Sequence, residues 1–255
     1  MSKTAFITGA ASGIGLATAR ALYARGWTLA MADINTEALR QLTFDWDHAR
    51  VTCYPLDVCN QAQFSHALTD FTARHNGQLN LLFNCAGILS IGRFEAISAE
   101  RHQQIMNINV MGVINGCQAA FPFLKATPGA LVVNMSSASA TYGIPGLASY
   151  SASKFAVSGL TEALQLEWEK YDINVCDVMP PFVSTPMLNE QAESAPVLKR
   201  LGVHLNADDV AKAVVRQTES AKTHRTVSLH FGLLYQLGQL SPRSITRAMV
   251  RMLNR

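Results

Sequence analysis

Short apolar runs alternate with longer stretches of helical periodicity along most of this chain of 255 residues. The short runs end at Gly, Asn, Asp or Ser, and apolar residues recur at helical spacing in the longer stretches. This alternation is typical of repeated βαβ units, in which helices cover both faces of a parallel sheet. The pattern therefore predicts an α/β fold with a doubly wound parallel sheet, whose strands are apolar along their whole length.

The predicted strands are residues 4–8, 28–33, 51–55, 79–84, 130–135, 174–179 and 226–231. The predicted helices are residues 14–24, 36–44, 60–75, 98–126, 150–171 and 207–219. No internal repeat, low-complexity segment or linker interrupts this series, because Pro and Gly lie between the elements. We therefore expect a single domain over residues 1–255, with a core at 4–231 and a C-terminal tail at 232–255.

The composition is that of a globular chain: 49% of the residues are apolar and 15% are charged, so a sizeable core can be buried. The net charge of +3 hides an asymmetry, because six cations and no acidic residue follow Glu219. Residues 1–219 therefore carry a net charge of −3. A mildly acidic body is a poor electrostatic match for a polyanion, so we expect no nucleic-acid partner.

Five cysteines are scattered along the chain, and none forms a C-x-x-C pair. An odd, scattered set argues against a disulfide framework and against zinc, so we expect buried thiols and no metal. No apolar run approaches the roughly 18 residues that can span a bilayer. The N-terminus shows no charged leader before an apolar segment, so we expect no signal peptide and a cytoplasmic protein.

A glycine-rich turn follows the first predicted strand and opens the first predicted helix, with the sequence Thr8-Gly9-Ala10-Ala11-Ser12-Gly13-Ile14-Gly15. Glycine allows backbone N–H groups to approach a pyrophosphate, and the helix dipole favours its negative charge. These features predict a dinucleotide site of the Rossmann type. Three glycines after a strand also occur in turns that bind nothing, and this alternative stays open for the motif alone.

The ends of the next three strands carry polar side chains. Asp33 lies 18 residues after Gly15, where a carboxylate accepts hydrogen bonds from a ribose and repels a 2′-phosphate. No Lys or Arg occupies positions 10–12 or 34–35, and a 2′-phosphate needs a nearby cation, so we expect NAD rather than NADP. The alternative is that Asp33 caps the helix that begins at residue 36. The following strand ends carry Asp57-Val58 and Asn84-Cys85-Ala86-Gly87.

A candidate proton-transfer group consists of Ser137, Tyr150 and Lys154, with Asn109 upstream. Tyr150 and Lys154 are four residues apart, so they share one face of a helix. A tyrosine hydroxyl has a pKa near 10, and we expect the adjacent ammonium to lower that pKa. Tyr150 can then exchange a proton with a carbonyl or alcohol oxygen, while Ser137 holds that oxygen. By itself, a Y-x-x-x-K pair is more often a solvated helix face.

In this order the motifs resemble those of the short-chain dehydrogenases/reductases, in the form that carries T-G-x-x-x-G-x-G and Y-x-x-x-K, over about residues 4–190. The resemblance implies a nicotinamide cofactor whose pyrophosphate is lined by Gly9, Ser12, Gly13, Ile14 and Gly15. It places Asp33 at the adenosine ribose, and the adenine beside Asp57 and Val58. The residues that it places beside the middle of the cofactor are Asn84, Ala86 and Gly87.

The same resemblance assigns the chemistry to Ser137, Tyr150 and Lys154, with the last two also contacting the cofactor. It implies that Asn109 anchors a water in a proton relay through the lysine. Contacts to the nicotinamide are implied for Pro180, Val183 and Thr185. A homodimer or homotetramer is implied through the predicted helices 98–126 and 150–171.

Two positions depart from the family pattern. Pro181 stands where glycine is usual, and proline fixes φ near −65° and lacks an N–H donor. We therefore expect the loop over the nicotinamide to have a different shape. Cys85 stands where a second asparagine is common, and we expect it to be tolerated as a small buried residue.

The tail is predicted to contain a helix that begins at Ser241-Pro242, because serine is a common N-cap residue and proline is common in the first turn. On this helix Ile245, Met249, Met252 and Leu253 share one face, and Arg243, Arg247, Arg251 and Arg255 share another. Three alternatives stay open: a helix docked on the body with solvated arginines, contact with a membrane surface or partner, or recognition of an anionic substrate head group.

We therefore expect an NAD-dependent oxidoreductase that transfers a hydride between nicotinamide and an apolar ketone or secondary alcohol, with Tyr150 as general acid/base. The apolar substrate surface is predicted from Leu147, Phe182, Met187, Leu188 and residues 233–240. A 3-oxoacyl thioester reductase is the enzymatic alternative. A non-catalytic, cofactor-binding regulator is the second alternative, although it has no chemical need for the four candidate catalytic residues.

Overall fold

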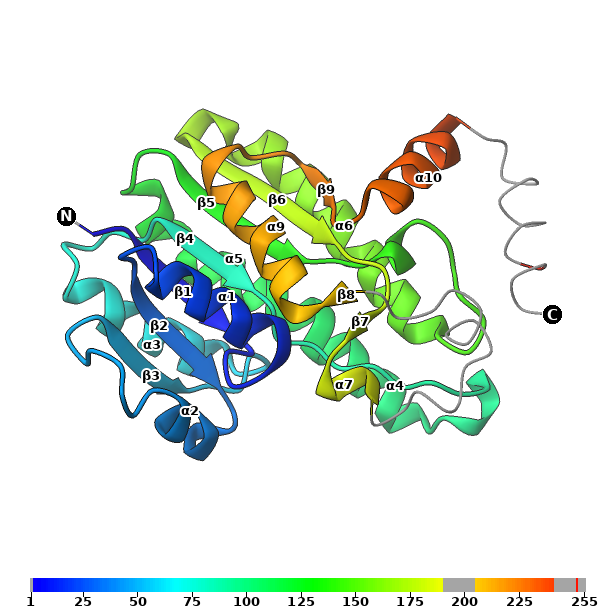
Figure 1. Cartoon of the computed structure of the whole chain (residues 1–255), viewed down its shortest axis with the longest axis horizontal. Coiled ribbons are helices and arrows are strands. Elements are labelled where there is room, and N and C mark those ends of the chain that lie inside the picture. Colours follow the sequence, from blue (N-terminus) through cyan, green and yellow to red (C-terminus); the bar gives the residue numbers. More distant parts are fainter. Residues whose placement is uncertain (1, 190–204, 241–250, 252–255) are drawn as a thin grey trace.

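Figure 1 shows the computed structural model, which describes residues 2–189, 205–240 and 251. Parallel strands form a seven-stranded sheet in the order β3-β2-β1-β4-β5-β6-β9. Their bounds are β1 Thr4–Thr8, β2 Thr28–Asp33, β3 Val51–Pro55, β4 Leu81–Asn84, β5 Ala130–Met135, β6 Ile173–Met179 and β9 His224–Thr226. A separate pair joins β7 (Val183–Ser184) to β8 (Leu205–Asn206). The chain reverses its direction across the sheet between β1 and β4, and doubly wound sheets bind ligands at such a switch point.

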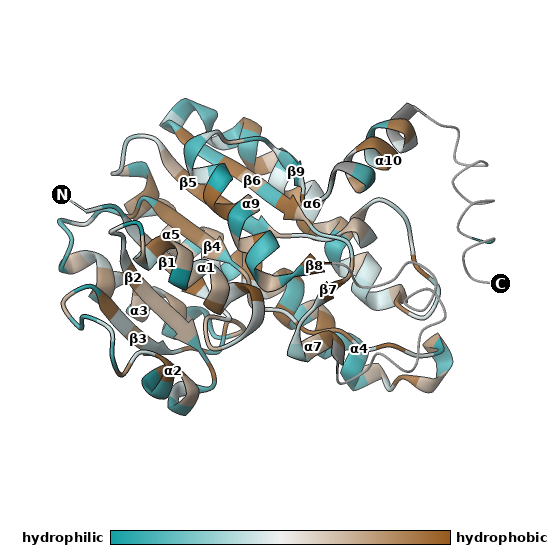
Figure 2. Cartoon of the chain, viewed as in Figure 1, coloured by the Kyte–Doolittle hydropathy of each residue, from teal (hydrophilic) through white to brown (hydrophobic). Residues whose placement is uncertain are grey.

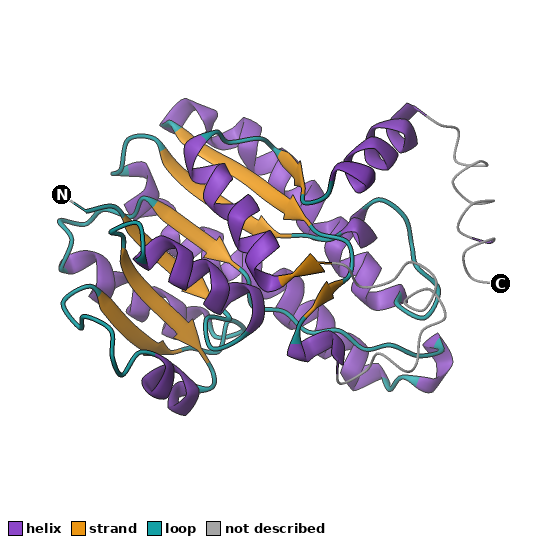
Figure 3. Ribbon diagram, in the orientation of Figure 1, coloured by secondary structure: helices purple, strands orange, loops and turns teal. Residues whose placement is uncertain are grey.

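Helices connect the strands and lie on both faces of the sheet (Figure 3). Their bounds are α1 Gly13–Tyr23, α2 Thr36–Leu42, α3 Gln61–Ala73, α4 Ala99–Met106, α5 Gly112–Lys125, α6 Ala148–Trp168, α7 Pro186–Asn189, α9 Ala207–Glu219 and α10 Leu229–Leu240. Short 3-10 turns occupy Phe94–Ala96, Ala138–Ala140 and Glu169–Tyr171, and a π-helical turn occupies Asn107–Met111. The observed layers confirm the predicted doubly wound α/β fold.

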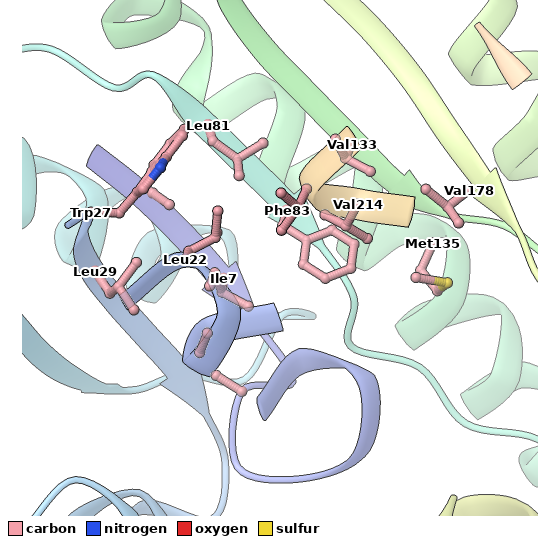
Figure 4. Packing of buried hydrophobic residues seen from close by; sticks show 14 of the residues in the cluster. Ile7, Leu22, Trp27, Leu29, Leu81, Phe83, Val133, Met135, Val178 and Val214 are labelled. Carbon is pink, nitrogen blue, oxygen red and sulfur yellow. The ribbon is translucent and has the colours of Figure 1, made fainter. Parts of the chain in front are cut away.

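Each face of the sheet has its own apolar core, which explains why the strands are continuously apolar. Ile7 packs with α1 and α9 residues such as Leu22 and Val214 (Figure 4), whereas its neighbour Phe6 packs on the opposite face with Phe64 of α3. The Phe6 and Phe64 rings stack with centroids 5.6 Å apart. The strands at the centre of Figure 2 accordingly appear in the brown of apolar residues. Two sandwiched cores hold the carboxyl ends of the strands in fixed positions.

The predicted helix 98–126 is interrupted, and this is the first difference from expectation. The structure divides it into α4, the π-helical turn Asn107–Met111 and α5. A π turn inserts one residue into the helical repeat and is often found at functional sites. Apolar periodicity continues through such a turn, so the sequence pattern did not reveal it.

The predicted strand 226–231 is wrong beyond its first residue, because the chain leaves β9 at Thr226 and enters α10 at Leu229. The Ser228 hydroxyl accepts a hydrogen bond from the Phe231 amide at 3.2 Å, which is the geometry of a helix cap. A short apolar run does not distinguish a strand from a helix, and the capping serine decides the outcome here. The helix predicted from Ser241 lies outside the described residues apart from Arg251.

The cysteines are free thiols, of which Cys117 and Cys176 are buried and Cys53 and Cys85 are partly buried. Cys59 is exposed, so the expectation that all the thiols are buried is wrong at this position. It lies in the loop after β3, beside Asp57, rather than in a strand or under a helix. Among the helices that the structure describes, none combines the length and the apolar character needed to cross a membrane.

Candidate active site

A cavity of about 790 Å³ lies at the carboxyl ends of the central strands. That volume is within the range of small-molecule and cofactor sites. The cavity is lined at one end by the glycine-rich turn, Asp33 and the loop after β3, and at the other end by Ser137, Tyr150 and Lys154. The predicted site residues line it with two exceptions, Asn84 and Asn109, which lie behind its wall.

The glycine-rich turn has no room for side chains at its closest approaches. A Cβ on Gly15 would lie 2.1 Å from the Gly9 carbonyl oxygen, and a Cβ on Gly9 would lie 2.9 Å from Ala86 Cα. Gly9 and Gly13 adopt positive φ angles of 66° and 50°, which favour glycine. Ser12, at the N-cap of α1, makes no capping hydrogen bond with its side chain. The N–H groups of the first turn therefore meet the cavity in the manner of an anion-binding helix terminus.

Thr8 joins this turn to the neighbouring strand end. Its hydroxyl oxygen accepts hydrogen bonds from the amides of Cys85 and Ala86, at 3.0 and 3.1 Å. The β4 loop is therefore held against the glycine turn. Thr8 is a positioning residue that the sequence analysis quoted in the motif without assigning it a role.

Asp33 is tied to the same turn by both of its carboxylate oxygens. Oδ2 accepts a hydrogen bond from the Ala11 amide at 3.0 Å, and Oδ1 accepts one from the Asn35 amide at 2.9 Å. The alternative that Asp33 caps the next helix is wrong, because the cap of α2 is Asn35, whose side chain accepts from the Ala38 amide. Each oxygen of Asp33 retains lone pairs for a further donor, such as a ribose hydroxyl.

The loop after β3 forms the wall beside Asp33. The Asp57 carboxylate accepts a hydrogen bond from the Cys59 amide at 2.9 Å, and the Val58 carbonyl accepts one from Asn115 Nδ2 at 2.9 Å. A Cβ on Gly112 would lie 2.7 Å from Val58 Cγ2. Asn115 and Gly112 of α5 therefore fix this loop, and neither position was identified from the sequence.

Lys154 projects from α6 into the opposite end of the cavity. Its side chain is only 4% exposed, and its Nζ donates a hydrogen bond to the Met135 carbonyl at 2.6 Å. Burial disfavours the ammonium and lowers the pKa of Lys154 to about 8. With a pKa of about 8 the amine is still mostly protonated at neutral pH, but it loses its proton well below the usual range of a lysine.

Tyr150 lies one helical turn before Lys154, with the lysine Nζ 5.6 Å from the centre of its ring. Burial raises the pKa of Tyr150 to about 12, and a hydrogen bond with Ser137 partly offsets that rise. The expected lowering of this pKa is therefore wrong for the chain without a ligand. The physical reason is that loss of water around the hydroxyl disfavours the phenolate, while the Lys154 amine donates to the Met135 carbonyl.

Asn109 lies at the centre of the π-helical turn and is completely buried. Its Nδ2 donates to the Ile88 carbonyl at 2.9 Å and to Ser153 Oγ at 3.0 Å, and its Oδ1 accepts from the Ile88 amide at 2.8 Å. These bonds connect the loop after β4 to α6, close to Lys154. The π turn is what places the side chain between these two elements.

Asn84 is directed into the sheet rather than into the cavity. Its Nδ2 donates to Asn134 Oδ1 at 2.9 Å, and Asn134 in turn donates to Thr161 of α6 at 3.0 Å. A Cβ on Gly116 would lie 2.4 Å from Asn84 Oδ1. The residue therefore aligns β4, β5 and α6, and it does not itself line the cavity.

The loop from Pro180 to Thr185 closes the cavity on the side of β6. The Pro180 carbonyl accepts from the Ala138 amide at 2.9 Å, which holds the loop beside the turn that carries Ser137. Pro181 and Val183 line the cavity as well. A Cβ on Gly13 would lie 3.6 Å from Thr185 Cγ2, so this loop reaches across to the glycine turn.

An apolar compartment adjoins Tyr150. Its buried members are Leu89, Ile144, Leu147 and Leu188, and its partly buried members are Ile91, Tyr142, Tyr150 and Phe182. The prediction that Leu147, Phe182, Met187 and Leu188 surround the reaction site agrees with their position on the cavity wall. The prediction is wrong for residues 233–238, none of which lines the cavity; the side chains of residues 239 and 240 lie outside the described ones.

Polar residues of α4 and of the first position of the π-helical turn form a second part of this wall, which no sequence motif had marked: Glu100, Gln103, Gln104 and Asn107. They follow the α4 cap, where Ser98 accepts from the Arg101 amide at 3.2 Å. No motif marks these residues, because helical polar residues usually face solvent. The cavity thus has an apolar side and an amide-rich side near the same tyrosine.

Comparison with known proteins agrees with the fold and the motifs. Residues 3–196 match the family described as short chain dehydrogenase. The chain is 37% identical to a 3-beta-hydroxysteroid dehydrogenase of Comamonas testosteroni over 188 residues, covering 73% of each protein. It is 30% identical to a 3-ketodihydrosphingosine reductase of Mus musculus over 220 residues, covering 82% of this chain and 66% of the mouse protein.

A solved structure of similar architecture is a short-chain dehydrogenase/reductase from Burkholderia phymatum in complex with NAD. It superimposes with a TM-score of 0.83 at 26% identity and covers 92% of both chains. The family match extends over more than half of the chain and includes both ends of the cavity. The chain therefore belongs to the short-chain dehydrogenase/reductase family of oxidoreductases, as the order of its motifs predicted.

Proposed function

We propose that this chain is an NAD-dependent oxidoreductase that transfers a hydride between nicotinamide and an apolar ketone or secondary alcohol. The observation that carries the proposal is one cavity with a glycine cradle and Asp33 at one end and Ser137, Tyr150 and Lys154 at the other. Support for the cofactor comes from the Burkholderia structure, which holds NAD. Support for an apolar substrate comes from the steroid and sphingosine names of the relatives.

The residues of the cavity fit a dinucleotide. Gly9, Gly13 and Gly15 leave the space that a pyrophosphate needs, and the uncapped N–H groups of α1 supply donors for its oxygens. Asp33 accepts hydrogen bonds from the adenosine ribose and repels a 2′-phosphate. Among the described residues that line the cavity, Lys154 is the only Lys or Arg, and it lies at the opposite end. This distribution of charge favours NAD over NADP.

Proton transfer is the task of the opposite end. With its pKa raised to about 12, Tyr150 is a phenol at neutral pH and donates a proton to a carbonyl oxygen during reduction. Ser137 donates a hydrogen bond to the same oxygen and stabilises the charge that develops there. A nicotinamide bound beside these residues would supply or accept the hydride, and its oxidised ring would be cationic. In the direction of oxidation, that positive charge and protonated Lys154 favour the tyrosinate that removes the alcohol proton.

Asn109 acts through its neighbours rather than on the substrate. It holds the Ile88 backbone against α6 and so keeps the cavity wall and Lys154 in register. The apolar compartment around Leu147 and Leu188 receives the hydrocarbon part of the substrate, because burial of apolar surface favours binding there. The substrate carbonyl then lies between Ser137 and Tyr150.

The test is the initial rate of the wild type and Tyr150→Phe with a panel of apolar ketones and secondary alcohols, with NAD(H) and NADP(H) compared. Loss of the proton donor is expected to lower kcat by at least about 100-fold while NADH binding is kept. Ser149→Ala, an adjacent α6 hydroxyl whose bond is to His102, is the matched control. A preference for NADPH would contradict the role of Asp33 and favour a 3-oxoacyl thioester reductase. NADH binding without turnover of any substrate would favour a regulator.

A further inference from the structure

Helix α10 presents leucines to solvent at the end of the described chain. Leu233, Leu234 and Leu237 are 63%, 54% and 61% exposed. Among residues 226–241 no Asp, Glu, Lys or Arg occurs, so the helix surface is apolar rather than charged. Figure 2 shows brown residues on this helix, which projects from the edge of the sheet beside β9. An isolated exposed leucine is ordinary, but a cluster on one short helix marks a contact surface.

The opposite side of α10 explains how the helix is held. The Tyr235 ring lies 6.3 Å from the His224 ring of β9, and the Phe231 and Tyr235 rings are also 6.3 Å apart. A Cβ on Gly232 would lie 2.9 Å from Thr226 Oγ1, so the first turn packs closely on the end of β9. The aromatic side therefore attaches the helix to the body, and the leucines face outward.

The charge of the surrounding sequence is entirely positive. After Glu219 the chain has no acidic residue, and its cations are Lys222, Arg225, Arg243, Arg247, Arg251 and Arg255. The body that precedes them is net negative. In the sequence, cations lie both before and after the apolar helix α10. This combination matches a surface that has both hydrocarbon and negative charge, which is the composition of an anionic lipid bilayer.

A second copy of the chain fits this helix less well. Three leucines at these exposures present on the order of 300 Å² of apolar surface, and pairing two such patches would bury about 600 Å², below the roughly 1,000 Å² of a stable interface. Membrane binding has no such area threshold, because apolar burial and charge attraction add.

We propose that α10 and the cationic C-terminal sequence dock this chain on an anionic membrane surface. The helix follows β9, which is parallel to the other strands of the sheet, so it leaves at the carboxyl edge where the cavity lies. Docking through the leucines thus holds that edge near the lipid. The inference stands on the exposed helix and the charge, and it does not depend on the identity of the substrate or cofactor.

The test is co-sedimentation of the full chain with vesicles of phosphatidylcholine alone and with vesicles in which phosphatidylglycerol replaces part of it. The wild type is expected to bind the anionic vesicles, and added salt is expected to weaken that binding. Leu233→Ser/Leu234→Ser is expected to lower partitioning by at least about tenfold, because burial of each leucine contributes on that order. Arg251→Gln is expected to lower it about fivefold. Phe44→Ser is the matched control, since Phe44 is 77% exposed but lies after α2.

Four results would overturn the proposal. The wild type could fail to bind anionic vesicles, or it could bind equally to both kinds. The leucine variant could bind as well as Phe44→Ser. In sedimentation velocity, the leucine variant could have a smaller mass than the wild type, which would assign the helix to a second copy. Circular dichroism checks whether each variant is folded. If the leucine variant is not folded, the salt dependence of the wild type and the binding of Arg251→Gln still decide the question.

Discussion

The closest contact in the cofactor cradle gives a sharp prediction for Gly15→Ala. The new Cβ would lie 2.1 Å from the Gly9 carbonyl oxygen, where about 3 Å is the least that real contacts allow, so the backbone must move by about 1 Å. Overpacking of this kind costs about 1–3 kcal/mol of stability. The movement also misplaces N–H groups at the pyrophosphate, and loss of one hydrogen bond to a charged group costs about 1.5–3 kcal/mol. NADH binding is therefore expected to weaken by at least about tenfold.

Two measurements check this expectation: NADH affinity from fluorescence titration and the free energy of unfolding from urea denaturation. Gly159→Ala is the matched control, because Gly159 also lies in a helix but a Cβ there meets no atom within 4 Å. That change is expected to stabilise the fold by about 0.5–1 kcal/mol and to leave NADH affinity unchanged. If Gly15→Ala binds NADH as tightly as Gly159→Ala, the cradle does not hold the pyrophosphate and the reasoning fails.

The remaining predictions concern the cofactor, pH and assembly. Asp33→Ala combined with Ile34→Arg is expected to move the kcat/KM ratio towards NADPH by at least about tenfold, because a repelling carboxylate is replaced by a cation, and an unchanged ratio would refute the role of Asp33. The hydrogen bond to Asp177 raises the pKa of His224 above its usual value near 6.5. Its stabilising contribution is therefore complete below that pH and is lost as pH rises through the higher folded-state pKa. Urea unfolding should separate the wild type from His224→Asn most at low pH, and a constant difference would contradict this. Leu166 of α6 is 75% exposed, and α6 is one of the two helices expected to pair between copies of the chain. Leu166→Arg is therefore expected to lower the mass measured by sedimentation. A wild type that sediments as a monomer would contradict the expected pairing.

Much of the fold could be predicted because local patterns and tertiary structure agree in the core. Phe6 and Ile7 both read as strand residues, and each finds a buried apolar face on its own side of the sheet. The spacing of Tyr150 and Lys154 likewise predicts a shared helix face, and the structure places both at the cavity. The spacing of residues along the sequence was enough to predict these features, because the secondary structure around them is regular.

The prediction failed where a single hydrogen bond or a helical irregularity decides the path. Ser228 caps a helix in a run of residues that suits a strand equally well, and only the capping contact separates the two. Helix α10 then projects from the body (Figure 1), and residues 233–238 do not line the cavity, which their apolar character alone did not reveal. The periodicity of apolar residues does not predict the direction in which a terminal helix leaves a sheet.

The pKa of Tyr150 shows the same limit in the chemistry. Sequence spacing places an ammonium near the phenol and predicts a lowered pKa, but it says nothing of how much water surrounds either group. In the fold Lys154 is buried and Tyr150 is partly buried with its hydroxyl shielded from water, so the pKa of the phenol rises to about 12 while that of the lysine falls to about 8. The two pKa values move apart, that of the phenol upward and that of the amine downward, because burial favours the neutral form of each. The unliganded site is therefore arranged to hold a neutral acid beside a weakly held proton, and a bound positive charge is what would convert the tyrosine into a base.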